Sequence, residues 1–270
     1  MKKLITLFAI LVTSLISNGQ TDEQLMERAF KFFGEDNYNA AIETCDQVIE
    51  NDSTNFDAHE LKANSKKKLK DFKGALDVYK RMIEIDPTFI FSYVNRADMK
   101  YFQLKDFTGA LVDYNKAVSI EPDNTTVYMR RGLAKRDFKD YKGATEDFSK
   151  AIELEPKNFW AYSERAETKR NAGDYAASIA DYSKAIEYEP KFWEIYYKRG
   201  NVKTDSKDFA GAIADYDKSL QLRPKNSPVV CGRGVAKILS GQKEGGCLDL
   251  NEAKKLGDKE ADGLIKKYCN

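Results

Sequence analysis

Apolar and small residues recur along most of the chain at intervals of three and four, the spacing of one buried face of an α-helix. In five places a small residue is followed four positions later by an aromatic one. These pairs are Ala75/Tyr79, Ala110/Tyr114, Ala144/Phe148, Ser178/Tyr182 and Ala212/Tyr216. One helical turn apart, the two residues share a face, and the small one lets a neighbouring helix approach closely. The pattern predicts closely packed amphipathic helices.

The helices belong to a repeat. A proline follows each of those small residues at the same distance, and the five prolines, Pro87, Pro122, Pro156, Pro190 and Pro224, are evenly spaced except that the first interval is longer by one. Earlier in each unit, an aromatic or apolar residue is followed four positions later by a small one. The instances are Leu25/Ala29, His59/Ala63, Tyr93/Ala97, Tyr128/Gly132, Tyr162/Ala166, Tyr196/Gly200 and Val230/Gly234. A fixed period of about 34 residues is typical of stacked supersecondary units.

Between the two small positions a short signature recurs, as in residues 105–110 (KDFTGA), 139–144 (KDYKGA) and 207–212 (KDFAGA). Together with the period, it resembles the tetratricopeptide repeat. The resemblance implies an all-α solenoid of about seven helix-turn-helix repeats over residues 20–257, wound as a superhelix. The outer repeats depart from the pattern. The first has Ser53 in place of proline, and the last has Gly246 and Leu250 at the positions of the small and the aromatic residue. The third repeat has one extra residue between Ala97 and Ala110.

The first nineteen residues have the composition of a signal peptide. Lys2 and Lys3 precede an apolar stretch from Leu4 to Ile16, and cleavage is expected after Gly19. Thirteen residues cover only ~20 Å as a helix, too short to span a bilayer core of ~30 Å. We therefore expect an exported bacterial protein, periplasmic or secreted, that is not an integral membrane protein after cleavage. An uncleaved anchor is the alternative.

Beyond Gly257, residues 258–270 are expected to form a capping helix for the last repeat. Cys247 lies ten residues before this glycine and Cys269 twelve after it, so an antiparallel helical hairpin brings the two to similar height. In an oxidising compartment this favours a disulfide, worth roughly 3 kcal/mol for a loop of ~20 residues. The end of the chain also looks like those of other exported bacterial tetratricopeptide proteins. Two unpaired thiols are the alternative, and that is what we expect of Cys45 and Cys231.

Five repeats carry an Arg on the first helix and an Asp on the second. The pairs are Arg96/Asp113, Arg131/Asp147, Arg165/Asp181, Arg199/Asp215 and Arg233/Asp249. The first two repeats lack the aspartate, so the arginine and the aspartate are found in nearly the same repeats. We interpret them as a ladder of partly buried ion pairs that fixes helix packing, rather than as a ligand site.

Composition argues against an enzyme. The 44 basic and 43 acidic residues nearly cancel, so no overall field recruits nucleic acid. No phosphate-binding, dinucleotide or zinc-protease motif is present, and neither a cofactor nor a metal is expected. The only histidine, His59, occupies a position that packs in this repeat family. The lysine-rich run at residues 66–70 (KKKLK) is interpreted as a solvated face, with an anionic partner as the alternative.

In the family that the chain resembles, the first helices of successive repeats line a concave groove that binds peptides or protein segments. The groove positions carried over to this sequence are Phe30, Phe33, Phe91, Val94, Tyr101, Met129, Trp160, Arg170, Tyr197 and Asn201. Exposed aromatic side chains beside Arg and Asn are typical of protein-binding patches. The pair of Lys and Asn with which some family members hold a chain-terminal carboxylate is missing, because the corresponding positions read Glu60/Asn64 and Tyr197/Asn201.

The sequence therefore predicts a non-catalytic scaffold that binds a protein or peptide partner in its groove, as a monomer or with weak self-association. Two alternatives remain. The chain could be a structural subunit of an envelope assembly complex that uses its convex face. It could also self-associate through its end repeats, where Phe30 and Phe33 provide apolar side chains.

Overall fold

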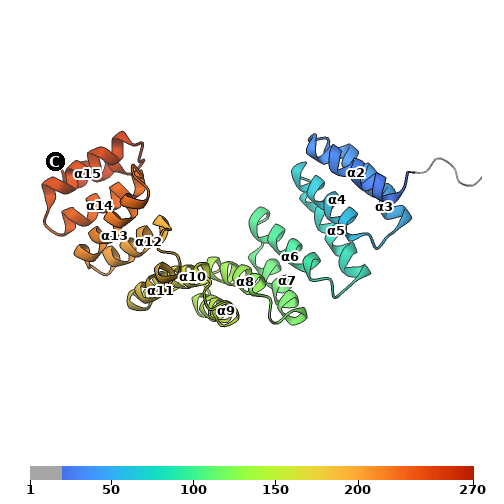
Figure 1. Cartoon of the computed structure of the whole chain (residues 1–270), viewed down its shortest axis with the longest axis horizontal. Coiled ribbons are helices and arrows are strands. Elements are labelled where there is room, and N and C mark those ends of the chain that lie inside the picture. Colours follow the sequence, from blue (N-terminus) through green and yellow to red (C-terminus); the bar gives the residue numbers. More distant parts are fainter. Residues whose placement is uncertain (1–19) are drawn as a thin grey trace, which may run out of the picture. The chain divides into compact units, whose positions relative to one another are not determined.

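The computed structural model describes residues 20–270 (Figure 1). The predicted signal peptide, residues 1–19, lies outside the described residues. Within residues 20–270 the chain forms fifteen α-helices and one short π-helix, and it contains no strand. The protein is an all-α solenoid, as the periodicity predicts.

The helices alternate between first and second members of each repeat. The first helices are α2 (Asp22–Gly34), α4 (Phe56–Lys68), α6 (Ile90–Asp98) continued by η1 (Met99–Gln103), α8 (Thr125–Asp137), α10 (Phe159–Asn171), α12 (Trp193–Asp205) and α14 (Ser227–Leu239). The second helices are α3 (Tyr38–Asn51), α5 (Phe72–Ile85), α7 (Phe107–Ile120), α9 (Tyr141–Leu154), α11 (Tyr175–Tyr188), α13 (Phe209–Leu222) and α15 (Lys243–Lys255). A last helix, α16 (Ala261–Tyr268), follows Gly257.

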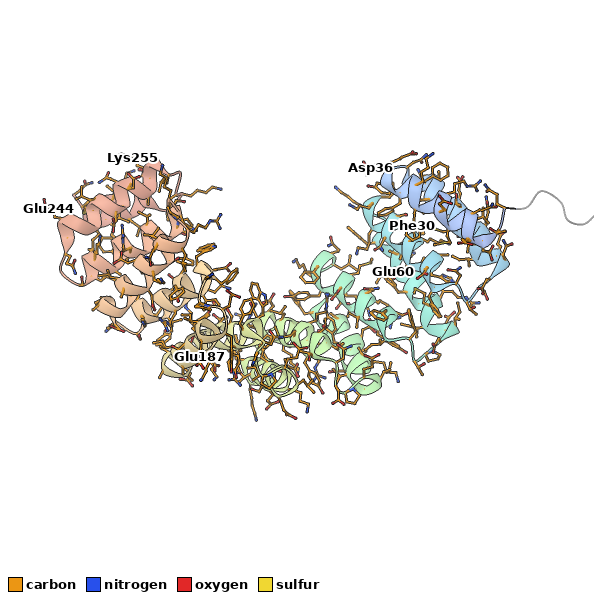
Figure 2. All side chains as sticks on the ribbon, in the orientation of Figure 1. Phe30, Asp36, Glu60, Glu187, Glu244 and Lys255 are labelled. Atoms are coloured by element: carbon orange, nitrogen blue, oxygen red, sulfur yellow. A yellow bond between two sulfur atoms is a disulfide. The ribbon has the colours of Figure 1, made fainter. Side chains whose placement is uncertain are left out.

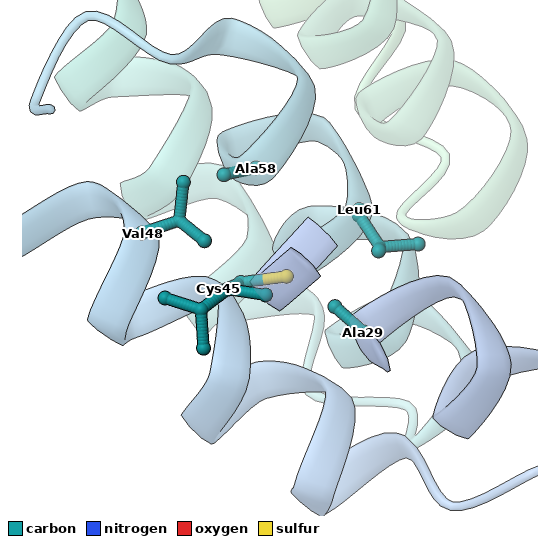
Figure 3. Packing of buried hydrophobic residues seen from close by; sticks show 6 residues of the cluster. Ala29, Cys45, Val48, Ala58 and Leu61 are labelled. Atoms are coloured by element: carbon teal, nitrogen blue, oxygen red, sulfur yellow. The ribbon is translucent and has the colours of Figure 1, made fainter. Parts of the chain in front are cut away.

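The chain divides into two compact units, one ending at Asp106 and one running from Phe107 to Asn270. In unit 1, each of the helices from α2 to α6 packs on the next, and α2 also contacts α4. Figure 3 shows the first of its cores, where Ala29 of α2, Cys45 and Val48 of α3, and Ala58 and Leu61 of α4 meet. Because these residues come from three consecutive helices, no helix pair buries its apolar face alone.

Unit 2 follows the same scheme from α7 to α16. Each helix packs on the next, and the first helices α8, α10, α12 and α14 also contact one another in order. The aromatic residue of the second helices is buried, as Phe148, Tyr182 and Tyr216 show, and Leu250 is buried at the same position of α15. Gly200 on α12 shows why each first helix carries a small residue at this position. A Cβ atom there would lie 2.8 Å from a ring carbon of Tyr216.

Polar side chains set the helix ends. Asp140, Asp174 and Asp208 each accept a hydrogen bond from the backbone N–H three residues later, which caps a second helix. Asn124 and Asn158 cap first helices in the same way. The capping aspartates belong to the recurring Lys-Asp or Gly-Asp signature, and the capping asparagines follow the repeat proline by two positions. The start of each helix therefore follows the sequence period.

The extra residue of the third repeat is accommodated by a change in helix type. The backbone N–H of Leu104 donates to the carbonyl of Met99, five residues earlier, and residues 99–103 form η1. A π-helical turn takes up one residue without breaking the helix. The insertion therefore alters the helical phase at this point instead of lengthening a loop.

The ladder of ion pairs is present in unit 2. Both Arg165 nitrogens that face Asp181 donate to its carboxylate, Nε to Oδ2 at 2.9 Å and the second nitrogen to Oδ1 at 2.7 Å. Equivalent two-point pairs join Arg131 to Asp147, Arg199 to Asp215 and Arg233 to Asp249. Arg96 and Asp113 belong to different units.

Each of these aspartates also binds a lysine that the sequence analysis overlooked. The lysine lies one turn after the arginine, and Lys169 Nζ is 2.8 Å from Asp181 Oδ2. The other three are Lys135, Lys203 and Lys237. Arg165 further donates to Ser149 Oγ of the preceding repeat at 3.0 Å, and its guanidinium lies 5.5 Å from the Tyr162 ring centroid. One arginine thus ties together three consecutive helices.

The end of unit 2 is closed by α16. Cys247 of α15 and Cys269, directly after α16, form a disulfide, with their Cα atoms 5.8 Å apart. Ala261 is fully buried, and Leu264 and Ile265 pack on the same cluster as Leu250. The other two cysteines of residues 20–270, Cys45 and Cys231, are buried and unpaired. The disulfide pairing and the two core thiols agree with the sequence analysis.

Candidate partner-binding face

The first helices of unit 2 form a continuous surface, here called the first-helix face, made of α8, α10, α12 and α14 and closed by α16. The pairing of each first helix with its own second helix leaves one side of the first helices uncovered. Side chains on this side are therefore positioned by helices rather than by loops, which fixes their spacing to the helical repeat.

A pocket of about 510 Å³ opens on this face near the C-terminal end of unit 2. It brings together Arg170 of α10 with Tyr197 and Asn201 of α12, three of the residues that the sequence analysis assigned to a groove. Its far wall comes from α14, through Cys231 and Val235, and from the segment leading into α16. With Tyr216 of α13 and Leu264 of α16, five helices contribute to one concave site.

Polar contacts fix how Asn201 is presented. Tyr216 donates its hydroxyl hydrogen to Asn201 Oδ1 at 2.7 Å, and the same hydroxyl lies 3.2 Å from Thr204 Oγ1. Because the amide oxygen is engaged, the amide NH₂ group of Asn201 is the part left to meet a ligand in the pocket. An amide NH₂ is a suitable donor for a peptide carbonyl.

Arg170 supplies a cation to the same pocket. Its Nε donates to Asp205 Oδ2 at 2.8 Å, and a second guanidinium nitrogen lies 3.5 Å from Glu167 Oε1. Burial lowers the pKa of Arg170, but the hydrogen bond to Asp205 and the charge of Glu167 outweigh it and raise the pKa overall. The two carboxylates therefore hold the guanidinium charged and in a fixed orientation at the rim.

Cys231 does not provide a nucleophile. Its thiol is buried, and burial together with the charge of Asp258 raises the pKa of Cys231 to about 12. The thiol thus stays protonated at neutral pH, and thiolate is the reactive form. Residues 20–270 contain no cluster of three or more His, Cys, Asp or Glu side chains arranged to hold a metal ion. The pocket is suited to binding, through aromatic, amide and ionic groups.

The remaining predicted groove residues of unit 2 lie outside this pocket. Trp160, at the start of α10, is 42% exposed and contacts Phe159 and Phe192 with ring centroids 5.1 and 5.3 Å away. Met129 of α8 packs partly buried against the cluster that contains Tyr128. The structure therefore unites three of the five unit 2 candidates.

In unit 1, Phe30 and Phe91 are 55% and 59% exposed. Figure 2 labels Phe30 on α2 and Glu60 on α4, which are both first helices. Phe33 and Val94 are half-buried. Tyr101 is different, because it is only 8% exposed. It lies in η1, where the changed helical phase turns its ring inward, so the assignment of Tyr101 to an exposed groove is corrected.

Sequence reasoning missed the pocket residues of the last repeat, although a signal was present. Cys231 and Val235 stand one full repeat after Tyr197 and Asn201, so the repeat register would have added them. It could not have added Asp258, Lys259 and Glu260, which come from the turn before α16 and have no counterpart in the repeat.

Family comparisons agree with this architecture. One tetratricopeptide repeat model matches residues 125–158 and 194–226, a second matches residues 148–180, and a TPR repeat model matches residues 100–136 and 169–204. The chain is a tetratricopeptide repeat protein. Members of this repeat family generally act as non-catalytic scaffolds that bind protein or peptide partners, and the matches indicate no catalytic family.

Several solved tetratricopeptide proteins share the fold. One from Parabacteroides merdae is 24% identical with a TM-score of 0.67, and the match covers 93% of this chain and 100% of that one. YrrB, described as a TPR protein with an unusual peptide-binding site, is 18% identical with a TM-score of 0.57, covering 70% and 97%. PilW, a type IV pilus biogenesis factor, is 14% identical with a TM-score of 0.64, covering 78% and 97%.

No curated protein matches this tetratricopeptide repeat protein in sequence. Among the helices of residues 20–270, none is both long enough and apolar enough to cross a membrane. At such low sequence identities, the structural matches establish the fold of the chain.

Proposed function

We propose that the protein is a non-catalytic scaffold that holds a peptide segment of a partner protein on the first-helix face of unit 2. The observation that carries the proposal is the pocket shared by Arg170, Tyr197 and Asn201. Concave sites with apolar walls and a few fixed polar groups are the usual form of a binding pocket. Here the tyrosine ring offers contact area, the Asn201 amide a donor, and Arg170 a fixed charge.

We further propose that the protein works in the cell envelope or outside the cell. The signal-like composition of residues 1–19 supports export, and the Cys247–Cys269 disulfide supports an oxidising compartment. The disulfide ties α16 to α15, and the turn before α16 forms a wall of the pocket. Oxidation would therefore stabilise the site as well as the end of the solenoid.

The test is an affinity purification from an extract of the source cells, with captured proteins quantified by mass spectrometry. The wild type is compared with Asn201→Asp, which keeps the oxygen that accepts from Tyr216 but loses the NH₂ donor. Tyr197→Ala removes the ring. A matched control, Lys184→Ala with Glu187→Ala, removes an exposed pair on the second helix α11.

We expect at least one protein to be captured by the wild type and the control and lost from both pocket variants. Equal capture by all four proteins would overturn the assignment of the first-helix face. Circular dichroism of each variant verifies that the helices are retained.

A further inference from the structure

The lysine-rich run of residues 66–70 forms part of a second pocket, in unit 1. This pocket has a volume of about 340 Å³ and lies where the end of α4 meets α2, α5 and Gln103 at the end of η1. Lys67, Lys68 and Lys70 line it together with Asn64 and two aromatic side chains, Phe33 and Phe72. The three cations and two rings therefore surround one opening.

The positive charge in this pocket is uncompensated. Lys66, the first residue of the run, is held by Asp71 at 2.9 Å and does not line the pocket. Lys67, Lys68 and Lys70 form no ion pair with a carboxylate anywhere in residues 20–270. Like charges brought close together without a partner attract an anion. The pocket is therefore suited to carboxylate or phosphate groups.

The backbone contributes to this concentration of charge. Lys70 has a positive φ of 62°. This left-handed conformation lies in the turn between the end of α4 and the start of α5. Its side chain thus departs from the chain at a point fixed by the turn, one residue before the Asp71 cap of α5. The helix end and the turn bring Lys70 to the same opening as Lys67 and Lys68.

Apolar walls accompany the charge. Phe33 and Phe72 are half-buried, Phe33 against the first core of unit 1 and Phe72 against the second. Phe33 also meets the edge of Tyr38, with ring centroids 5.4 Å apart. The rings are therefore held by packing, and each leaves an apolar surface open to a ligand. A phosphate ion alone would leave this surface uncovered.

The charge of the rest of the unit narrows the class of ligand. Residues 20–106 contain 17 Asp and Glu against 13 Lys and Arg, so unit 1 is acidic outside the pocket. A nucleic acid carries charge along its whole backbone and needs an extended positive track. A short acidic segment with an apolar side chain needs only this opening.

We propose that the pocket of Phe33, Asn64, Lys67, Lys68, Lys70 and Phe72 binds an acidic peptide segment. Asp or Glu side chains of the segment lie against the three lysines, and an aromatic or aliphatic side chain lies between Phe33 and Phe72. The Asn64 amide is placed to bond the peptide backbone. This inference rests on the proposed function, because it names the kind of segment that a peptide-binding scaffold takes up in unit 1.

The experiment selects ligands from a phage-displayed library of short random peptides against the full mature protein. The carboxyl end of each peptide is fused to the coat protein, so only side-chain carboxylates are presented. Selection is repeated on the variant Lys67→Gln/Lys68→Gln/Lys70→Gly. Glycine is chosen at position 70 because it adopts the left-handed conformation freely.

A matched control removes the same charge elsewhere. Lys139 occupies the equivalent turn position in unit 2, with a φ of 64°. Lys139→Gly with Lys142→Gln and Lys157→Gln changes three exposed lysines that line none of the pockets described above and have no ion pair within residues 20–270.

We expect the wild type and the control to enrich peptides in which Asp or Glu flank an aromatic or aliphatic residue. The pocket variant should bind an enriched peptide roughly ten-fold more weakly, as expected for three partly exposed ion pairs. The affinity should also fall with added salt. Replacing the Glu residues of that peptide by Gln should weaken binding to the same extent.

Four results would overturn the inference. Equal affinity of the pocket variant and the wild type for the peptide would show that the three lysines do not contribute to binding. Enriched peptides without acidic residues that are lost on Tyr197→Ala would leave the proposed function standing and refute this one. Tighter, lysine-dependent binding of single-stranded DNA than of any peptide would make the occupant a nucleic acid. Failure to enrich any peptide would count against both proposals.

Discussion

The ion pairs of unit 2 predict how much substitutions of Asp181, Arg165 and Lys169 each lower the stability of the protein. Asp181 accepts three cationic donors, two from Arg165 at 2.9 and 2.7 Å and one from Lys169 at 2.8 Å. Its side chain is only 8% exposed, whereas both cations keep about a fifth of their side-chain surface in water. The aspartate is therefore the member that depends most on its partners.

We expect Asp181→Ala to lower the free energy of unfolding by about 3 kcal/mol. This lies at the lower end of the ~3–5 kcal/mol range for breaking a buried pair, because the two cations left behind regain water. Arg165→Ala should cost about 3 kcal/mol as well, since it also loses the bond to Ser149 and the contact with Tyr162. Lys169→Ala should cost only about 1 kcal/mol, because Arg165 still neutralises the carboxylate.

The assay is urea unfolding of residues 20–270 followed by circular dichroism. Because repeat proteins need not unfold in one step, transition midpoints are compared alongside the fitted free energies. Lys184→Ala is the control, since its pair with Glu187 is more than half exposed and should leave the unfolding midpoint almost unchanged. If Asp181→Ala unfolded at the same urea concentration as Lys184→Ala, the ladder would not contribute to stability.

Three further predictions concern other parts of the fold. Gly200→Ala should destabilise the protein by about 1–3 kcal/mol in thermal unfolding, because the new Cβ would lie 2.8 Å from a Tyr216 ring carbon. Burial lowers the pKa of His59 below its ordinary 6.5, so its contribution to stability is complete above about pH 6.5. It should be lost as the pH falls through that value toward the folded-state pKa, as pH-dependent urea unfolding would show. Replacing both Cys247 and Cys269 by Ser should cost roughly 3 kcal/mol for a sequence separation of 22 residues, measured as increased hydrogen exchange in α16.

Each of these predictions has its own control. Gly34→Ala adds a Cβ that meets nothing within 4 Å, so its thermal midpoint should not fall. Equal losses at Gly34 and Gly200 would refute the packing argument. His59→Gln should reduce the pH dependence between about pH 7 and 5, and an unchanged slope would assign that dependence to other groups. If the cysteine variant left exchange in α16 unaltered, the disulfide would not hold this helix.

The sequence was most informative where the repeat register acts on local structure. The prolines, the capping Asp and Asn residues and the small and aromatic pairs each have a physical role that recurs from repeat to repeat, so a single repeat explains the others. The Arg–Asp pairs were found in the same way. The lysine that shares each aspartate follows the same register, and it was missed because only pairs were compared.

Features that occur once were harder to predict. One extra residue between Ala97 and Ala110 can be taken up by a loop or by a helix, and only the structure shows the π-helical turn that buries Tyr101. The pocket wall formed by Asp258, Lys259 and Glu260 depends on how the last turn folds back onto α14. The pocket of unit 1 likewise depends on the meeting of α2, α4, α5 and η1. Such sites arise from tertiary packing, which a repeat pattern alone does not specify.

The central claim is that a partner lies on the first-helix face, and site-specific photocrosslinking tests it most directly. A photoreactive phenylalanine analogue replaces Tyr197 in one protein and Glu187, on the second helix α11 (Figure 2), in another. With the partner identified by affinity purification, we predict a crosslink from position 197 and none from position 187. A crosslink from position 187 alone would contradict the account and assign binding to the second helices.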